Sequence, residues 1–231
     1  MSFMHTGAME HVPSLTQPCE DRDFAEWHQG CPWCAVWVVL VHDAAVAASV
    51  QAARHALGAA LLPRYARQPH LTLAYRGLCA ADGHPQAEFG AARLQADLAA
   101  LQALQQLPFS VQLQGLGSFT TVPYLCVTQG AAELAGLHQA LQRQPPVAGW
   151  RYVPHLTLGH YAQALPMLAL VERLHALGIG QPALPLQVEQ LALVRYATQD
   201  IAGPLTAEGV WDLQQQRYFP APEALLALQA A

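Results

Sequence analysis

The pentapeptide Pro69-His70-Leu71-Thr72-Leu73 recurs without change as Pro154-His155-Leu156-Thr157-Leu158. With average residue frequencies, an identical repeat of this length arises by chance in about one such chain in a hundred, and more often in leucine-rich chains. Two copies so far apart are too few for a solenoid, in which each repeat packs on the next. The repeat therefore predicts a duplicated half-domain.

Each copy of the repeat has a polar and an apolar face if it forms a β-strand, because side chains alternate along a strand. His70 and Thr72 share one face, and so do His155 and Thr157. Imidazole can act as base or acid near neutral pH, and a hydroxyl can donate to a phosphate oxygen. We predict that the two histidines share proton transfer at a phosphate, with the threonines as phosphate ligands. The residues do not decide which histidine is the base.

Hydrophobic patterns on both sides of the repeat predict a mixture of helices and strands. The mixture lacks strict strand–helix–strand alternation, which favours the α+β class over a doubly wound parallel sheet. Asp43 is a predicted helix N-cap, and Pro222 is expected to open a short terminal helix. We predict strands at residues 35–41, 69–75, 109–116, 123–128, 150–161, 184–196 and 210–218, and helices at residues 44–61, 85–106, 131–144 and 165–177.

The length of 231 residues allows one large domain or two fused halves that share a core. Residues 1–30 are polar, rich in histidine and without periodicity, so we expect a poorly ordered lead-in there. No change of composition divides residues 31–231. They are expected to form a single domain.

The charge balance limits the ligands. The eleven basic residues are all arginine and are outnumbered by sixteen acidic ones. The chain therefore lacks the broad basic surface that long nucleic acid requires, and an anionic ligand must be held locally. No apolar run approaches the roughly 18 residues of a membrane span, and no secretory signal is evident. With five cysteines, an odd number, we expect a cytoplasmic protein with reduced thiols and no membrane association.

Further motifs accompany the repeat. Residues 113–119, Leu-Gln-Gly-Leu-Gly-Ser-Phe, precede a strand-like segment at 123–127, and Tyr152-Val153-Pro154 leads into the second histidine. Together these segments resemble the two-histidine (2H) phosphoesterases, which carry paired His-x-Thr/Ser-x motifs on central strands of two related lobes. Known branches are the 2'-5' RNA ligase-like proteins and the 2',3'-cyclic nucleotide phosphodiesterases. The resemblance covers about residues 34–218.

The resemblance implies an α+β fold of two pseudo-symmetric lobes, each an antiparallel sheet with helices packed outside, and a catalytic cleft between them. His70 and His155 match the family's catalytic histidines, and Thr72 and Thr157 match its phosphate-binding hydroxyls. The implied activity is a phosphodiesterase without metal or cofactor, acting on a small nucleotide with a 2',3'-cyclic phosphate, on a 2'-5' linkage or on a short RNA end. A non-catalytic nucleotide-binding or RNA-end-binding module and a reversible 2'-5' RNA ligase remain as alternatives.

One departure affects substrate recognition. The ligase-like branch has Ala-Arg after its second motif, where this chain has Gly159-His160, so long RNA is an unlikely partner. Arg76 has even spacing from His70, and we propose it as a substitute phosphate contact. His160 has odd spacing from His155 and is expected to face away from the site. Three tyrosines are candidates for stacking on a base: Tyr75, Tyr124 and Tyr152.

Cys31-Pro-Trp-Cys34 is a candidate redox or zinc element, with His28 and Cys19 as further candidate ligands. A thioredoxin-like motif follows a strand and opens a helix, whereas this pair precedes a predicted strand. Four zinc ligands at standard spacing are also missing. Free, partly buried thiols are the expected state.

Overall fold

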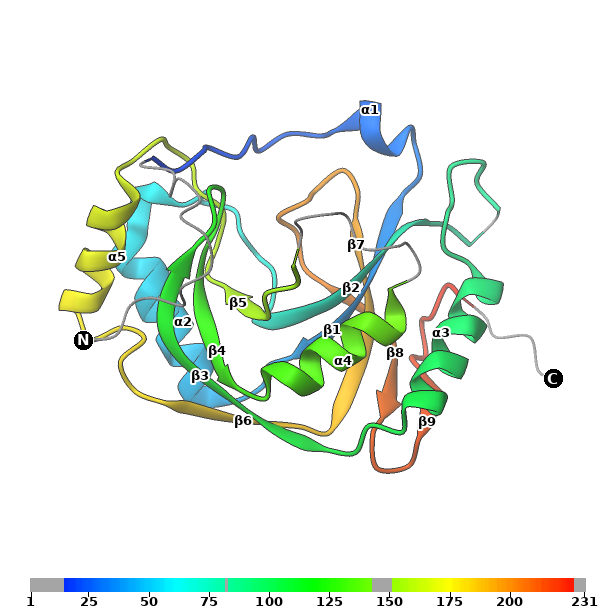
Figure 1. The fold of residues 1–231 in the computed structure, drawn as a ribbon. Helices are drawn as coiled ribbons and strands as arrows, with labels where there is room; N and C mark the ends of the chain where they lie inside the picture. The colour runs from blue at the N-terminus through cyan, green and yellow to red at the C-terminus, as the bar shows by residue number, and fades with distance from the viewer. Residues whose placement is uncertain (1–14, 82, 143–150, 227–231) are drawn as a thin grey trace.

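The computed structural model describes residues 15–81, 83–142 and 151–226, which form one antiparallel sheet with helices (Figure 1). The sheet has nine strands in the order β6-β3-β4-β5-β2-β1-β7-β8-β9. The strands are β1 Trp33–Leu40, β2 His70–Cys79, β3 Phe109–Ser118, β4 Pro123–Gln129, β5 His155–Thr157, β6 Leu184–Val188, β7 Gln190–Ala197, β8 Thr206–Asp212 and β9 Arg217–Pro220. The helices are α1 Ala25–His28, α2 Ala44–Leu57, α3 Ala91–Leu104, α4 Ala131–Leu141 and α5 Met167–Ala176, with a 3₁₀ turn η1 at Gly58–Ala60.

The strand order is mirrored about the contact between β5 and β2. On one side β1, α2 and β2 follow one another in the chain, and on the other side β4, α4 and β5 do the same. In each set the first strand lies antiparallel to the strand that carries the repeat. The predicted duplication is therefore visible as two related lobes whose sheets join into one.

The lobes meet where Leu71 of β2 pairs with Leu156 of β5. Both leucines are fully buried. They belong to a core that also takes residues from α2, α3, α4 and α5, so all four helices contribute to the core on this face of the sheet. The helices pack in pairs, α2 on α5 and α3 on α4, as Figure 1 shows.

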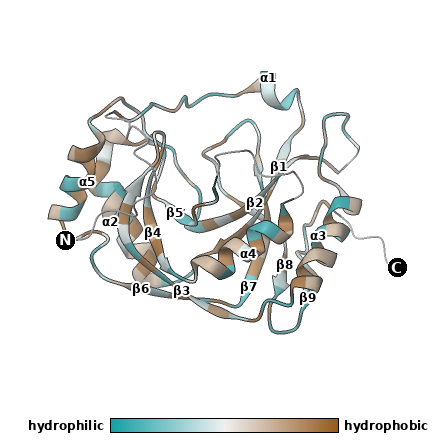
Figure 2. Cartoon of the chain, viewed as in Figure 1, coloured by the Kyte–Doolittle hydropathy of each residue, from teal (hydrophilic) through white to brown (hydrophobic). Residues whose placement is uncertain are grey.

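Hydrophobic residues line long stretches of the strands and of α3 and α5 (Figure 2), in keeping with this core. A smaller cluster, which includes Val36, Val38 and Val194, covers part of the opposite face of β1 and β7. No helix in the described ranges is long and apolar enough to cross a membrane.

Some elements differ in extent from the prediction. Asp43 caps α2 as predicted, because its carboxylate accepts from the Val46 N–H at 2.9 Å. α3 begins at Ala91 rather than residue 85, since the N–H groups of Glu88 and Phe89 donate instead to the Leu78 carbonyl. The segment 184–196 splits into β6 and β7, and β5 keeps only three residues of the predicted strand 150–161. Residues 222–226 form turns rather than the expected helix.

Residues 15–30 do not behave as the expected loose lead-in. Thr16 is buried, its N–H donates to the Leu165 carbonyl at 2.8 Å, and its hydroxyl donates to the Gln163 carbonyl at 2.6 Å. The Cys19 N–H donates to the Tyr161 carbonyl at 2.7 Å. Composition does not reveal these bonds, because they use backbone groups and a threonine hydroxyl rather than apolar side chains. Residues 1–14 lie outside the described part.

Candidate active site

The two repeated histidines make the same local hydrogen bond. Nδ1 of His70 lies 2.7 Å from the Gln68 carbonyl oxygen, and Nδ1 of His155 lies 2.7 Å from the Val153 carbonyl oxygen. A carbonyl only accepts, so each Nδ1 donates its proton. In the neutral ring, Nε2 is then the nitrogen left with a lone pair. Both imidazoles thus carry a basic nitrogen held in a fixed orientation.

The register between β2 and β5 brings the polar residues of the repeat together. Because Leu71 pairs with Leu156 in antiparallel strands, the neighbouring positions place His70 opposite Thr157 and Thr72 opposite His155. All four lie on the face of the sheet opposite the helix-side core. Each histidine therefore has the threonine of the other copy beside it.

Burial lowers the pKa of both histidines. The pKa of His70 falls to about 4, chiefly through desolvation, with further lowering by the charge of Arg67 and the neighbouring His155. Desolvation also lowers the pKa of His155, against the bond to the Val153 carbonyl, which favours the charged ring. At pH 7 both rings are therefore predominantly neutral in the free protein.

A cavity of about 1040 Å³ opens at this junction between the lobes. Thr72 and His155 line it, so it reaches the repeat from both central strands. Of the other predicted site residues, Tyr75, Arg76 and Tyr152 also line the cavity, and Tyr75 is half exposed. Further lining residues include Glu88, Arg93, Phe119, His138, Gln142 and Arg151.

Aromatic rings surround His155. Its ring centroid is 5.1 Å from that of Tyr124 and 5.0 Å from that of Phe119, and the two aromatic rings are 4.7 Å apart. Gly117 lies opposite Tyr124 in the ladder, and a Cβ at this glycine would come too close to the tyrosine ring. Gly117 therefore leaves room for the Tyr124 ring, which is tilted by 54° to the ring of His155.

Tyr152 connects the second motif to the first. Its hydroxyl donates to the Thr72 carbonyl at 2.7 Å, and its ring stacks on that of His138 with centroids 4.2 Å apart. Nδ1 of His138 in turn donates to the Leu73 carbonyl at 2.7 Å. These bonds hold the lead-in to His155 against β2. A base-stacking role for Tyr152 stays a prediction, since one face of its ring is covered by His138.

Arg76 lines the cavity, but its guanidinium is bound within the protein. It forms a buried ion pair with Asp97 of α3, whose carboxylate also accepts from the Trp37 indole at 3.0 Å, and Nη1 donates to the Leu141 carbonyl at 2.6 Å. These contacts tie β2 to α3 and α4. The phosphate contact predicted for Arg76 stays a prediction.

Phe119 and His138 were not among the predicted site residues. Phe119 stands in the motif that carries the resemblance, so a signal for it existed. His138 gives no such signal, because its approach to β2 depends on the packing of α4. His160 follows β5, which ends at Thr157, so strand alternation does not govern its direction. Its ring meets Tyr65 with centroids 5.0 Å apart.

One cysteine borders this site, since Cys126 of β4 pairs with His155 of β5 in the ladder. All five are free thiols, and Cys31 and Cys34 are fully buried. Desolvation raises the pKa of both thiols. His28, weighed as a zinc ligand, has its Nε2 2.6 Å from the Asp23 carboxylate. Within the described ranges, no three His, Cys, Asp or Glu side chains gather closely enough to hold a metal ion.

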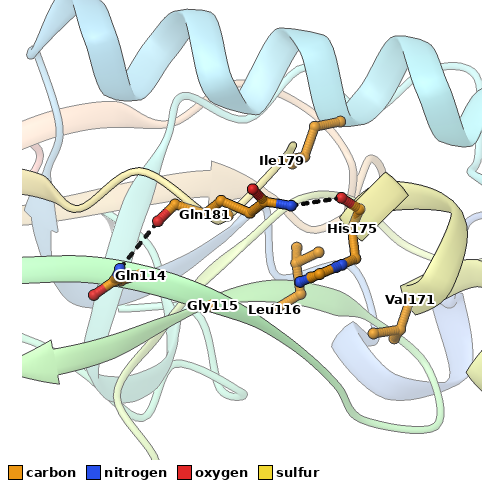
Figure 3. A pocket seen from close by; sticks show the side chains of 8 residues that line it. Gln114, Gly115, Leu116, Val171, His175, Ile179 and Gln181 are labelled. Carbon is orange, nitrogen blue, oxygen red and sulfur yellow. Dashed lines mark hydrogen bonds between the residues drawn. The ribbon is translucent and has the colours of Figure 1, made fainter. Parts of the chain in front are cut away.

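A smaller cavity of about 390 Å³ lies between β3 and α5 (Figure 3). Gln114 and Gln181 line it, and Gln114 donates to the Gln181 carbonyl at 3.0 Å. His175 is the one titratable side chain among its lining residues. None of the repeated residues lines this cavity, so a substitution here leaves the groups of the candidate active site in place.

Comparison with known proteins agrees with this arrangement. The family model of the 2'-5' RNA ligase superfamily matches residues 41–200. Escherichia coli LigT with 3'-AMP is 19% identical, with 80% of this chain and 99% of that chain covered at a TM-score of 0.51. A structure described as a phosphoesterase is 18% identical, with 80% and 100% covered at 0.50. No curated protein matches significantly. The predicted fold class and resemblance are confirmed.

Proposed function

The chain belongs to the 2'-5' RNA ligase superfamily, and we propose that it is a metal-independent phosphodiesterase that opens 2',3'-cyclic phosphates or cleaves 2'-5' linkages in nucleotides or at RNA ends. The observation that carries the proposal is the pairing of the two His-x-Thr copies across adjacent strands. Each copy supplies an oriented imidazole beside the hydroxyl of the other. This is the set of groups that in-line phosphoryl transfer to water needs.

In the proposed reaction, Nε2 of one histidine removes a proton from a water molecule while the water oxygen forms a bond to phosphorus. The bond from phosphorus to the 2' or 3' oxygen breaks, and Nε2 of the other histidine protonates that leaving oxygen. The hydroxyls of Thr72 and Thr157 donate to the non-bridging oxygens. Charge that develops on those oxygens is thereby stabilised without a metal ion. Proton exchange with solvent then restores the starting state.

The acid must carry a proton that it lacks in the free protein at neutral pH. A bound phosphate favours protonation of this histidine, because a nearby negative charge stabilises the imidazolium and raises its pKa. Substrate binding thus prepares the acid. The neutral partner, whose pKa burial has lowered, is ready to act as the base.

A small nucleotide fits the proposal better than long RNA. The net charge of −5 and the absence of lysine disfavour extended phosphate tracking. The rings of Phe119 and Tyr124 beside His155 offer faces for a base. Among structures of similar fold, one LigT holds 3'-AMP and another holds phosphate, which supports a small phosphate-bearing ligand here.

The proposal is tested with the four nucleoside 2',3'-cyclic phosphates and 2'-5'-linked diadenosine monophosphate, each incubated with the protein in excess EDTA. We expect turnover of at least one substrate, unchanged within twofold by the chelator, and a single product isomer by chromatography. Loss of turnover in EDTA would exclude the metal-independent mechanism. Binding of all substrates without product would point to the binding module, and joining of two RNA ends would point to ligation.

A further inference from the structure

Arg67 lies beside the candidate active site without a counter-ion. Several other arginines pair with carboxylates, as Arg64 does with Asp21 and Arg195 with Glu208. In the ranges that the structure describes, no Asp or Glu oxygen lies within 4.0 Å of Arg67. Its Nε is buried and has no hydrogen-bond partner there. A half-buried cation with an unsatisfied donor costs folding free energy unless an anion balances its charge and accepts its hydrogen bond.

The Arg67 side chain is held in place. Its Cζ lies 4.1 Å from the ring centroid of Tyr196, a cation–π contact that fixes the plane of the guanidinium. The Arg67 carbonyl accepts from Arg54 Nη2 at 3.4 Å. Arg54 too has no carboxylate within 4.0 Å among the described residues. Among the described residues, neither arginine therefore has a balancing acid within that distance.

The backbone around Arg67 is anchored by the next residue. The Gln68 side-chain amide donates to the Leu205 carbonyl at 3.0 Å, and its oxygen accepts from the Leu205 N–H at 2.9 Å. The carbonyl of the same Gln68 orients His70. One short segment therefore positions both a predicted catalytic imidazole and an unpaired cation, so the two are fixed relative to each other.

The strand order shows where the Arg67 contact lies relative to the two strands that carry the repeat. Tyr196 is on β7 and His70 is on β2, with β1 between them, whereas His155 is on β5 at the other side of β2. Arg67 therefore stacks on a residue of β7, which is two strands from β2 on the side opposite to β5. Desolvation is the main cause of the lowered pKa of His70 and of His160, and the charge of Arg67 lowers both pKa values further. The reacting phosphorus, between the two histidines, is not where this guanidinium sits.

We propose that Arg67 binds a second phosphate of the substrate, adjacent to the phosphate that reacts. This inference rests on the proposed function for the identity of the reacting group. In a nucleoside 2',3'-cyclic phosphate, the 5' oxygen is on the same ribose, so a phosphate on it lies one sugar away. The second phosphate is either a 5'-phosphate monoester or the neighbouring phosphodiester of an RNA end. Arginine suits it, because its donors can bind two phosphate oxygens at once.

Equilibrium binding tests the subsite without turnover. We would titrate adenosine 3'-phosphate and adenosine 3',5'-bisphosphate into wild type, Arg67→Gln and a control, Arg217→Gln, by calorimetry. Arg217 is a fair control because it also contacts an aromatic ring, Phe219 on β9, at 5.3 Å. We expect wild type and the control to bind the bisphosphate about tenfold more tightly than the monophosphate, and Arg67→Gln to lose that preference.

Two results would overturn the inference: equal affinities in wild type, or an Arg67→Gln variant that weakens both ligands alike. Arg67→Lys, which keeps the charge, is expected to retain most of the preference and guards against misfolding as the cause. Hydrolysis of adenosine 2',3'-cyclic phosphate, its 5'-phosphorylated form and the cyclic-phosphate dinucleotide then separates the two sources of the second phosphate. Failure of wild type to hydrolyse any of them would count against the proposed function alone, since the binding comparison stands without it.

Discussion

Replacing either repeated histidine by asparagine is expected to lower kcat for the hydrolysed substrate by about 100- to 10,000-fold. Asparagine keeps a nitrogen near the position of Nδ1, so His70→Asn can still donate to Gln68 and His155→Asn to Val153. Both variants lack Nε2, the atom that moves the proton. Steady-state kinetics at saturating substrate measure the loss, and thermal melts confirm that each variant is folded.

The control for this prediction is His175→Asn, an exposed histidine that lines the smaller cavity. It should retain the wild-type kcat within twofold. The double variant is expected to be about as slow as either single variant, because residues that act as a unit are not additive. A His155→Asn enzyme that keeps a tenth or more of the wild-type rate would refute the shared proton transfer.

Leu156→Ala is expected to lower the free energy of unfolding by about 2–5 kcal/mol. The side chain is fully buried, and its partner across the strands, Leu71, is equally buried. Truncation removes apolar contacts and leaves a cavity at the contact that joins the two lobes. Urea denaturation at pH 7, followed by tryptophan fluorescence, gives the change.

Leu168→Ala on α5 provides the matched control, since this leucine is 69% exposed. Its effect should stay within about 0.5 kcal/mol. If Leu156→Ala were no more destabilising than Leu168→Ala, the β2–β5 contact would not be the junction that holds the lobes together. Activity below the melting temperature should survive in both variants, because neither removes a polar group of the site.

The sequence predicts the parts of the fold that local patterns govern. The run 35–41 is β-branched and apolar because β1 is buried on both faces, and Asp43 signals the start of α2. Tertiary contacts govern the rest. α3 starts later than predicted because the backbone N–H groups of Glu88 and Phe89 donate to the Leu78 carbonyl. The residues near Phe89 give no sequence signal for these two hydrogen bonds. β5 is short because only three of its predicted residues find ladder partners.

The candidate site follows the same division. The period of a strand is enough to put His70 and Thr72 on one face, and the repeat supplies the second pair. The same period predicts that Arg76 faces the site, yet Asp97 of α3 holds its guanidinium, a contact between segments that spacing does not reveal. Spacing gives no signal for Arg67, because its contact with Tyr196 joins two segments that are far apart in the sequence.

The central claim is that His70 and His155 divide acid and base between them, and the pH dependence of kcat/KM tests it most directly. The base must be neutral, so the rate rises with pH through its pKa, and the acid must be protonated, so the rate falls through its pKa. Burial lowers both values in the free protein, which puts both limbs of the bell below about pH 6.5.

The measurement compares wild type with His70→Asn and His155→Asn between pH 4 and 9 in EDTA. We expect a bell with its maximum below pH 6.5 for wild type, and a profile with a single limb for the residual activity of each variant. The alkaline limb of kcat should lie at higher pH than that of kcat/KM, because bound phosphate raises the acid's pKa. A maximum above pH 7.5, or a bell that both variants retain, would contradict the two-histidine mechanism.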